Sequence, residues 1–142
     1  GVMIETPSAA LVSDQIFDIV DFASFGTNDL TQYVMAADRL DSRLSDLTNS
    51  WHPAVLRIIQ LVGKNAKNKS LGVCGEAAAD PQLAAVLIGL GVNSLSMASN
   101  SISEVKSFIA TQDLNKCQKV AQEVMNTKNA IEAKNLAIKL FN

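Results

Sequence analysis

The sequence contains no apolar run of about 18 residues, so no segment is long enough to cross a membrane as a helix. It has only two cysteines, Cys74 and Cys117, which are too few for a disulfide framework. We therefore expect a reducing compartment, the cytoplasm, and the lack of a basic-then-apolar leader agrees with this. Lysine and arginine form no stripe and the net charge is −2, so we expect neither nucleic-acid nor membrane binding.

The composition is nevertheless that of a chain with a core. Of the 142 residues, 48% are hydrophobic and 18% are charged, which argues against disorder. Gly1 leads directly into a run that has the character of a buried strand. We therefore expect residues 1–142 to be one partial domain, cut from a longer protein.

Four short apolar runs are typical of strands buried on both faces, because none alternates between polar and apolar residues over any length. A helix signal follows each run. Thr6, Asp29 and Asp80 are residue types that cap helix starts, and Ser101 with Glu104 has the spacing of a capping box. The predicted strands are residues 2–4, 22–25, 71–74 and 94–97, and the predicted helices are residues 9–19, 30–37, 54–62, 82–90, 105–110, 114–125 and 130–141.

Strand and helix alternate four times, and additional C-terminal helices close the chain. This order predicts right-handed βαβ units and an α/β fold with a parallel sheet. The polar residues 38–49 are predicted to form a long loop. A complete (β/α)₈ TIM barrel needs about 250 residues, so the chain holds about half of one. The pattern leaves open whether the strands form an open sheet or half a barrel with two unpaired edges.

Two carboxylates are expected at neighbouring strand ends, where parallel α/β folds place their sites. Glu5 and Asp29 could hold Mg²⁺, because one or two carboxylates with water and substrate phosphate commonly complete its shell. The alternative is that Asp29 only caps a helix and Glu5 is solvated. Asn28, at the same helix start, could donate to a phosphate, and Arg39 could bring a guanidinium fork to it.

Cys74 lies between two glycines at the predicted end of the third strand, where backbone and substrate can approach closely. Such a thiol could be a nucleophile or a proton donor, or it could be inert. Cys117, on a predicted amphipathic helix, is expected to be inert. His52 precedes Pro53 at a helix start, and we interpret this single histidine as structural.

Taken together, these residues belong to four blocks that occur in a characteristic order. The blocks are GVMIETPSAA from Gly1, FGTNDLTQY from Phe25, ADR from Ala37 and GVCGEAAAD from Gly72. The chain resembles the phosphoenolpyruvate-utilising enzymes, and among them most closely the phosphoenolpyruvate–protein phosphotransferases, the Enzyme I group of the bacterial sugar phosphotransferase system. The resemblance covers nearly the whole chain. It implies the carboxyl-terminal half of a (β/α)₈ barrel.

Carried over position by position, the resemblance implies a role for each candidate residue. Glu5 and Asp29 would hold Mg²⁺, and Asn28 and Arg39 would contact the phosphoryl group of phosphoenolpyruvate. Cys74 would protonate the methylene carbon of enolpyruvate as pyruvate forms. This agrees with the chemistry, because phosphoryl transfer depends mainly on positioning and on neutralisation of charge.

The resemblance also implies partners. The family's phosphoryl acceptor is a histidine on a separate domain, from which a histidine-containing phosphocarrier protein is phosphorylated, and the barrel domain forms a homodimer. Because that histidine and the first half of the barrel are missing here, we expect the chain to be inactive alone. The alternatives are a pyruvate phosphate dikinase or phosphoenolpyruvate synthase, which share the same motifs, and a non-catalytic interaction module.

Overall fold

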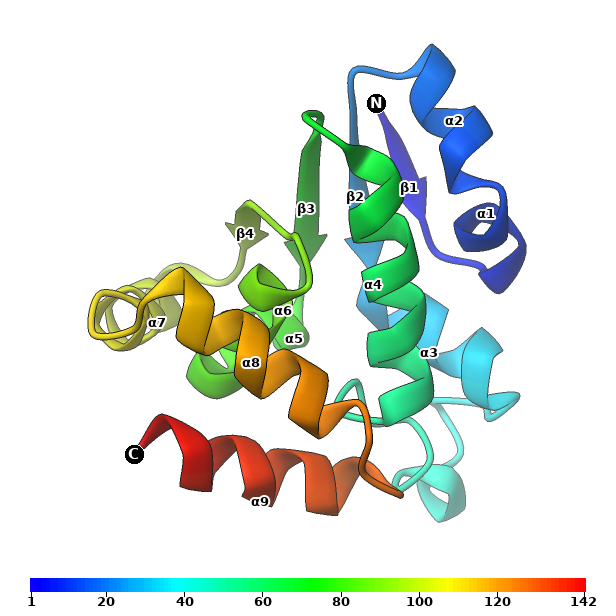
Figure 1. Ribbon diagram of the computed structural model, residues 1–142. Coiled ribbons are helices and arrows are strands. Elements are labelled where there is room, and N and C mark those ends of the chain that lie inside the picture. The colour runs from blue at the N-terminus through cyan, green and yellow to red at the C-terminus, as the bar shows by residue number, and fades with distance from the viewer.

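The molecule is built on a four-stranded parallel sheet (Figure 1). The structure is a computed structural model that describes residues 1–142. Its strands are β1 (Val2–Ile4), β2 (Phe22–Gly26), β3 (Ser70–Cys74) and β4 (Ser94–Ser96), and they lie in this order across the sheet. All four predicted strands are present, each within one residue of its predicted bounds. The expected α/β fold with a parallel sheet is therefore confirmed.

Helices follow every strand, and two additional helices close the chain, as the sequence predicts. After β1 come α1 (Pro7–Leu11) and α2 (Ser13–Ile19); after β2 come α3 (Thr27–Met35), the 3₁₀ turn η1 (Ser42–Leu44) and α4 (Pro53–Ala66); after β3 come α5 (Glu76–Ala79) and α6 (Pro81–Gly89); after β4 come α7 (Ser99–Ile109), α8 (Leu114–Val124) and α9 (Ala130–Phe141). None of these helices combines the length and apolar character that a membrane crossing requires.

The two faces of the sheet differ in character. Paired residues of parallel strands share a face, so the register separates a row that packs under the helices from a row that faces away from them. The first row holds Ile4, Phe25, Val73 and Leu95, and the second holds Met3, Ser24, Gly72 and Ser94. In the helix-facing row, Ile4, Phe25 and Val73 belong to the hydrophobic core and Leu95 packs against it, whereas the other row is small, polar or exposed. Helices therefore cover only one face of the sheet.

Several predicted helix boundaries are wrong. The expected single helix 9–19 is two helices that meet at Val12, and α7 begins two residues before Ser101, so the capping-box prediction fails. Helix α4 runs on past Gly63, at which the sequence predicted its end. A Cβ on Gly63 would overlap the carbonyl oxygen of Leu90, so this glycine serves close packing and not helix termination.

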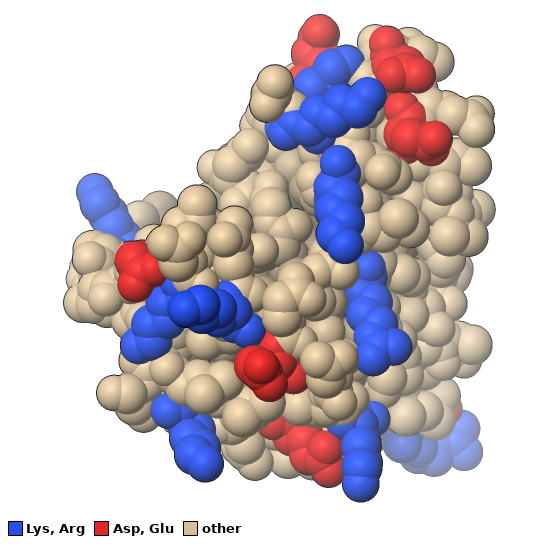
Figure 2. Space-filling model, in the orientation of Figure 1, with Lys and Arg blue, Asp and Glu red and all other residues tan.

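The helices that follow β4 pack against α6. In Figure 1, α8 lies between α6 and α9, and both pairs are in contact. Arg57 on α4 donates from Nε and Nη2 to the carbonyl oxygen of Met125 at 3.1 and 2.9 Å, which joins α4 to the end of α8. On the face in Figure 2, basic side chains are spaced along α4, α8 and α9 with neutral and acidic ones between them.

Candidate functional site

The carboxyl ends of β1, β2 and β3 lie side by side at the same end of the sheet, because all strands are parallel. Glu5 directly follows β1, Asn28 and Asp29 lie in the first turn of α3 after β2, and Cys74 is the last residue of β3. In the register, Gly26 is paired with Cys74. The sequence-based placement of these residues at strand ends is therefore correct.

The Glu5 side chain lies over the end of β2. A Cβ built on Gly26 would overlap Glu5, lying 2.7 Å from its Cγ and 2.9 Å from its Cδ. The absence of a side chain at Gly26 thus makes room for the carboxylate. Glu5 therefore lies beside Gly26, the N-cap of α3, and Asp29 is in the first turn of that helix.

Asp29 does not cap α3, contrary to one of the two alternatives. The N-cap is Gly26 and makes no side-chain cap bond, and Asp29 lies inside the first turn. Its Oδ1 is 3.8 Å from Arg39 Nη2, and both side chains are partly exposed, at 40% and 45%. The Arg39 backbone N–H donates to Gln32 Oε1 at 3.2 Å. Arg39 thus contacts α3 twice: its main chain binds Gln32, and its guanidinium lies near Asp29 in the first turn.

Cys74 is half-buried and is held from two sides. Its Sγ donates to the carbonyl oxygen of Phe25 at 3.3 Å, and its own carbonyl oxygen accepts from Thr27 Oγ1 at 3.2 Å. Gly75 follows with φ of 90°, a conformation that favours glycine. The thiol therefore lies against the carboxyl end of β2, near the start of α3.

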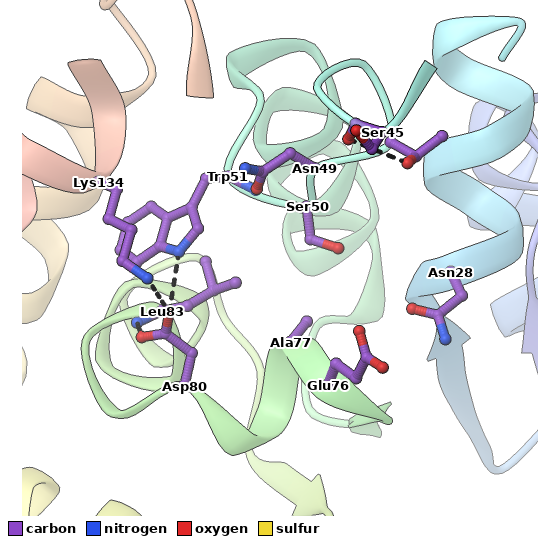
Figure 3. Close-up of a pocket in the computed structure, with 11 residues that line it drawn as sticks. Asn28, Ser45, Asn49, Ser50, Trp51, Glu76, Ala77, Asp80, Leu83 and Lys134 are labelled. Carbon is purple, nitrogen blue, oxygen red and sulfur yellow. Dashed lines mark hydrogen bonds and ion pairs between the residues drawn. The ribbon is translucent and has the colours of Figure 1, made fainter. Parts of the chain in front are cut away.

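Two surface pockets have Asn28 in their lining, and Glu5, Asp29 and Cys74 line neither of them. One, of about 330 Å³, is lined by Asn28, Arg39, Leu40, Thr48 and Glu76. The other, of about 290 Å³, also reaches Asn28 and Glu76 (Figure 3).

In Figure 3, Asn28 and Glu76 lie on one side of the second pocket, and Trp51, Asp80 and Lys134 lie on the other. The two candidate phosphate contacts, Asn28 and Arg39, thus line the same cavity. Leu40 and Thr48 were not predicted as lining residues, although both belong to the predicted long loop 38–49.

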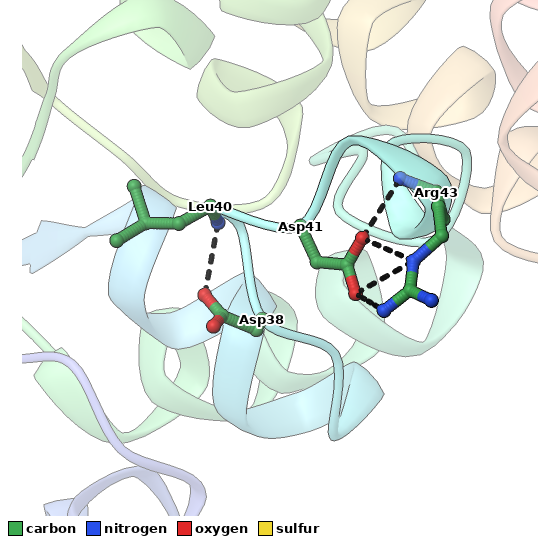
Figure 4. A network of polar contacts seen from close by, with 4 residues as sticks. All are labelled: Asp38, Leu40, Asp41 and Arg43. Atoms are coloured by element: carbon green, nitrogen blue, oxygen red, sulfur yellow. Dashed lines mark hydrogen bonds and ion pairs between the residues drawn. The ribbon is translucent and has the colours of Figure 1, made fainter.

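The loop between α3 and α4 has its own polar contacts (Figure 4). Asp38 Oδ1 accepts from the Leu40 N–H at 2.9 Å, and Asp41 forms a 2.7 Å ion pair with Arg43. The hydrogen bonds from Arg43 lower the pKa of Asp41, and the same pairing raises the pKa of Arg43. The Arg43 side chain of this pair is exposed, and that of Asp41 is partly buried.

The remaining sequence predictions concern residues outside this site. His52 is structural as predicted, because its Nδ1 accepts the Ala54 N–H at 3.2 Å and caps α4. Cys117 is buried, and burial raises the pKa of its thiol, which agrees with an inert residue. No group of three or more His, Cys, Asp or Glu side chains could by itself hold a metal. Two carboxylates with water and a phosphate remain a donor set suited to Mg²⁺.

Comparison with known proteins adds to this geometry. Residues 1–114 match the family described as PEP-utilising enzyme, PEP-binding domain. A phosphoenolpyruvate-protein phosphotransferase of Streptomyces coelicolor is 47% identical over 139 residues, 96% of this chain and 25% of that protein. One of Haloferax volcanii is 42% identical over 134 residues, 93% of this chain and 24% of that protein.

A Salmonella typhimurium protein named phosphoenolpyruvate-dependent phosphotransferase system is 38% identical over 136 residues, 94% of this chain and 18% of that protein. The chain thus spans about a quarter or less of the length of these relatives.

Proposed function

The chain belongs to the PEP-utilising enzymes, through their PEP-binding domain, and on this premise we propose that it is part of a phosphoenolpyruvate–protein phosphotransferase. The reaction would transfer the phosphoryl group of phosphoenolpyruvate to an enzyme histidine and on to a histidine-containing phosphocarrier protein, and it would release pyruvate. In such a system the phosphoryl group would serve sugar uptake. The names of the relatives favour this function over the dikinase and synthase alternatives.

The main observation behind the proposal is that the candidate residues follow the carboxyl ends of neighbouring strands. Asn28 and Arg39 line one cavity, and Asp29 lies 3.8 Å from Arg39. Cys74 is on the neighbouring strand end, bonded to β2. The groups that would bind phosphate, a carboxylate and a thiol thus all follow the carboxyl ends of β2 and β3, and this supports the proposal.

Asn28 and Arg39 would bind the phosphoryl group of phosphoenolpyruvate. The Asn28 amide can donate to a phosphate oxygen from the start of α3, where backbone N–H groups also favour an anion. The Arg39 guanidinium can bind two phosphate oxygens at once and offset the charge that spreads over them during transfer. Asp29, whose Oδ1 is 3.8 Å from Arg39 Nη2, would help to orient that guanidinium.

Glu5 and Asp29 would hold Mg²⁺. They are carboxylates that follow adjacent strands, and Gly26 leaves the space in which the Glu5 carboxylate lies. When bound, Mg²⁺ would neutralise phosphate charge and thereby favour phosphoryl transfer.

Cys74 would complete the release of pyruvate. As the phosphorus–oxygen bond of phosphoenolpyruvate breaks, the electron pair stays with the enolate, and its methylene carbon takes the proton from the Cys74 thiol. A new C–H bond forms, the S–H bond breaks, and the thiolate regains a proton from solvent. The thiol is half-buried and lies against the carboxyl end of β2, where it contacts the Phe25 carbonyl oxygen, which supports this role.

The four strands would be the carboxyl-terminal half of a (β/α)₈ barrel. The open face and the two unpaired edges, on β1 and β4, are supporting observations, because a closed barrel leaves neither. The first half and the acceptor histidine would come from other parts of a cytoplasmic, homodimeric protein. His52 would not be that acceptor, because the resemblance puts the acceptor on a separate domain, and here His52 Nδ1 caps α4.

Phosphorylation of the carrier tests the proposal. The intact protein should transfer the phosphoryl group from phosphoenolpyruvate to the carrier when Mg²⁺ is present, and Cys74→Ala should abolish pyruvate release. Cys117→Ala is the matched control and should retain activity, because Cys117 is buried on α8, outside the candidate site. Residues 1–142 alone should transfer nothing. An intact protein that binds no phosphoenolpyruvate would refute the proposed function.

A further inference from the structure

We propose that Thr27 is a positioning residue for the Cys74 thiol. The observation behind this is a hydrogen bond across 47 residues, in which Thr27 Oγ1 donates to the Cys74 carbonyl oxygen at 3.2 Å. Thr27 is only 1% exposed, so water does not compete for this hydroxyl. The inference rests on the proposed function, since it assigns Thr27 to the residue that would protonate enolpyruvate.

The peptide unit between Cys74 and Gly75 is held at both of its polar atoms. Thr27 binds its carbonyl oxygen from the β2 side, and the Gly75 N–H donates to the Ser96 carbonyl oxygen on β4 at 3.2 Å. With both ends bonded, rotation about the Cα–C bond of Cys74 is restricted. This restriction fixes the direction in which the Cys74 Cα–Cβ bond points.

The side chain of Cys74 depends on that direction. Its Sγ reaches the Phe25 carbonyl oxygen at 3.3 Å, a contact that requires the end of β3 to keep its place against β2. Phe25 and Thr27 are on either side of Gly26, the residue paired with Cys74. One short segment therefore holds Cys74 by its thiol and by its main chain.

The position of Thr27 explains why a side chain is needed there. The β2–β3 pairing ends at Gly26 and Cys74, and α3 begins at Thr27. The Cys74 carbonyl oxygen thus lies beyond the last paired residue of β2. The Thr27 hydroxyl takes the place of the backbone donor that one more paired residue would offer.

The first test measures alkylation of Cys74 by iodoacetamide in the chain itself. The buried Cys117 should stay unmodified while the fold is intact, so its alkylation reports unfolding. Thr27→Val keeps the shape and removes the donor, and we expect Cys74 to react about threefold faster or more, because the freed thiol leaves Phe25. Thr27→Ser keeps the hydroxyl and should react at the wild-type rate. This readout does not depend on phosphoenolpyruvate, so it fails or succeeds independently of the proposed function.

Thr31→Val is the matched control. Thr31 is also on α3 and 1% exposed, and its hydroxyl contacts Ser50 Oγ at 3.3 Å, away from Cys74. This variant should lose stability similarly and leave Cys74 alkylation unchanged. Equal alkylation rates in Thr27→Val, Thr31→Val and wild type would overturn the inference, as would the same increase in both variants.

The second test uses the intact protein. We expect Thr27→Val to lower kcat about tenfold with little change in the KM for phosphoenolpyruvate, because a misplaced proton donor slows the reaction without weakening binding. Thr27→Ser should restore kcat. An unchanged kcat would also overturn the inference. If Thr27→Val does not fold, Thr27→Ala replaces it in both tests with the same expected results, because it also removes the hydroxyl donor.

Discussion

Trp51 Nε1 donates a hydrogen bond to Asp80 Oδ2 at 3.1 Å, and the same oxygen accepts one from Lys134 Nζ at 3.1 Å. Asp80 Oδ1 accepts the Leu83 N–H and caps α6. One carboxylate thus joins the end of the α3–α4 loop, the start of α6 and the C-terminal helix α9 beside the second pocket (Figure 3). Lys134 also lies outside residues 1–114, which match the PEP-binding domain.

Asp80→Ala should therefore destabilise the fold and free the loop. Loss of the cap costs about 1 kcal/mol, and the buried Trp51 N–H left without a partner costs about 1–3 kcal/mol. Urea unfolding measures the loss. Trp51 is the only tryptophan, so its fluorescence should shift to longer wavelength as the loop loosens. Lys134→Gln, which removes a partly exposed ion pair, should cost less than about 1 kcal/mol. An unchanged unfolding midpoint in Asp80→Ala would contradict this account.

Gly26→Ala should disturb the site through sterics. A Cβ at this position would overlap the Glu5 side chain, so Glu5 must move or the strand must shift, at a cost of about 1–3 kcal/mol. Unfolding free energy and Mg²⁺ affinity should both fall. Gly72→Ala is the control on β3: its nearest neighbour would be Ser24 Oγ at 3.1 Å, which can move aside. Equal effects of the two substitutions would show that the Glu5 contact does not matter.

Metal affinity tests the two carboxylates directly. In the intact protein, Glu5→Gln and Asp29→Asn should each weaken Mg²⁺ binding about tenfold or more, because each removes a charged oxygen ligand. Isothermal titration calorimetry in the presence of phosphoenolpyruvate measures this. Asp21 directly precedes β2, at the amino end of the strands, so the Asp21→Asn variant should bind Mg²⁺ like wild type. Wild-type affinity in both site variants would remove the proposed metal ligands.

Ala36→Gly should stabilise the protein. Ala36 ends α3 with φ of 50° and ψ of 38°, a left-handed conformation that costs a residue with a Cβ about 1 kcal/mol or more. We expect a net gain of about 0.5–1 kcal/mol in urea unfolding, after the larger chain entropy of glycine is subtracted. Ala54→Gly, inside the right-handed helix α4, should have the opposite sign. A loss of stability in Ala36→Gly would argue against the left-handed end of α3.

Cys117 should make stability depend on pH in the alkaline range. Burial raises the pKa of its thiol, so the folded state keeps a proton that the unfolded state releases above about pH 8.5. The free energy of unfolding therefore falls as pH rises through that range, by at most about 1.4 kcal/mol per pH unit. Cys117→Ala should remove this part of the slope. A slope identical in both proteins would show that the thiol does not titrate differently on unfolding.

The sequence alone determined the four strands, most of the helices and the residue types of the candidate site. Strong local signals were sufficient for the four strands and for the caps Thr6 and Asp80, because an apolar run or a capping side chain acts over a few residues. The positions of the carboxylates, the amide and the thiol were predictable in the same way. Parallel strands bring their carboxyl ends to the same end of the sheet.

Only the tertiary structure decided how these residues meet. Gly63 looked like a helix end, but its lack of a side chain serves the close approach of Leu90, which no local pattern shows. Likewise, Thr27 is an ordinary helix residue until β3 is placed beside it and the Cys74 carbonyl oxygen comes within 3.2 Å. Contacts between residues tens of positions apart depend on how elements pack, and packing is a property of the whole fold.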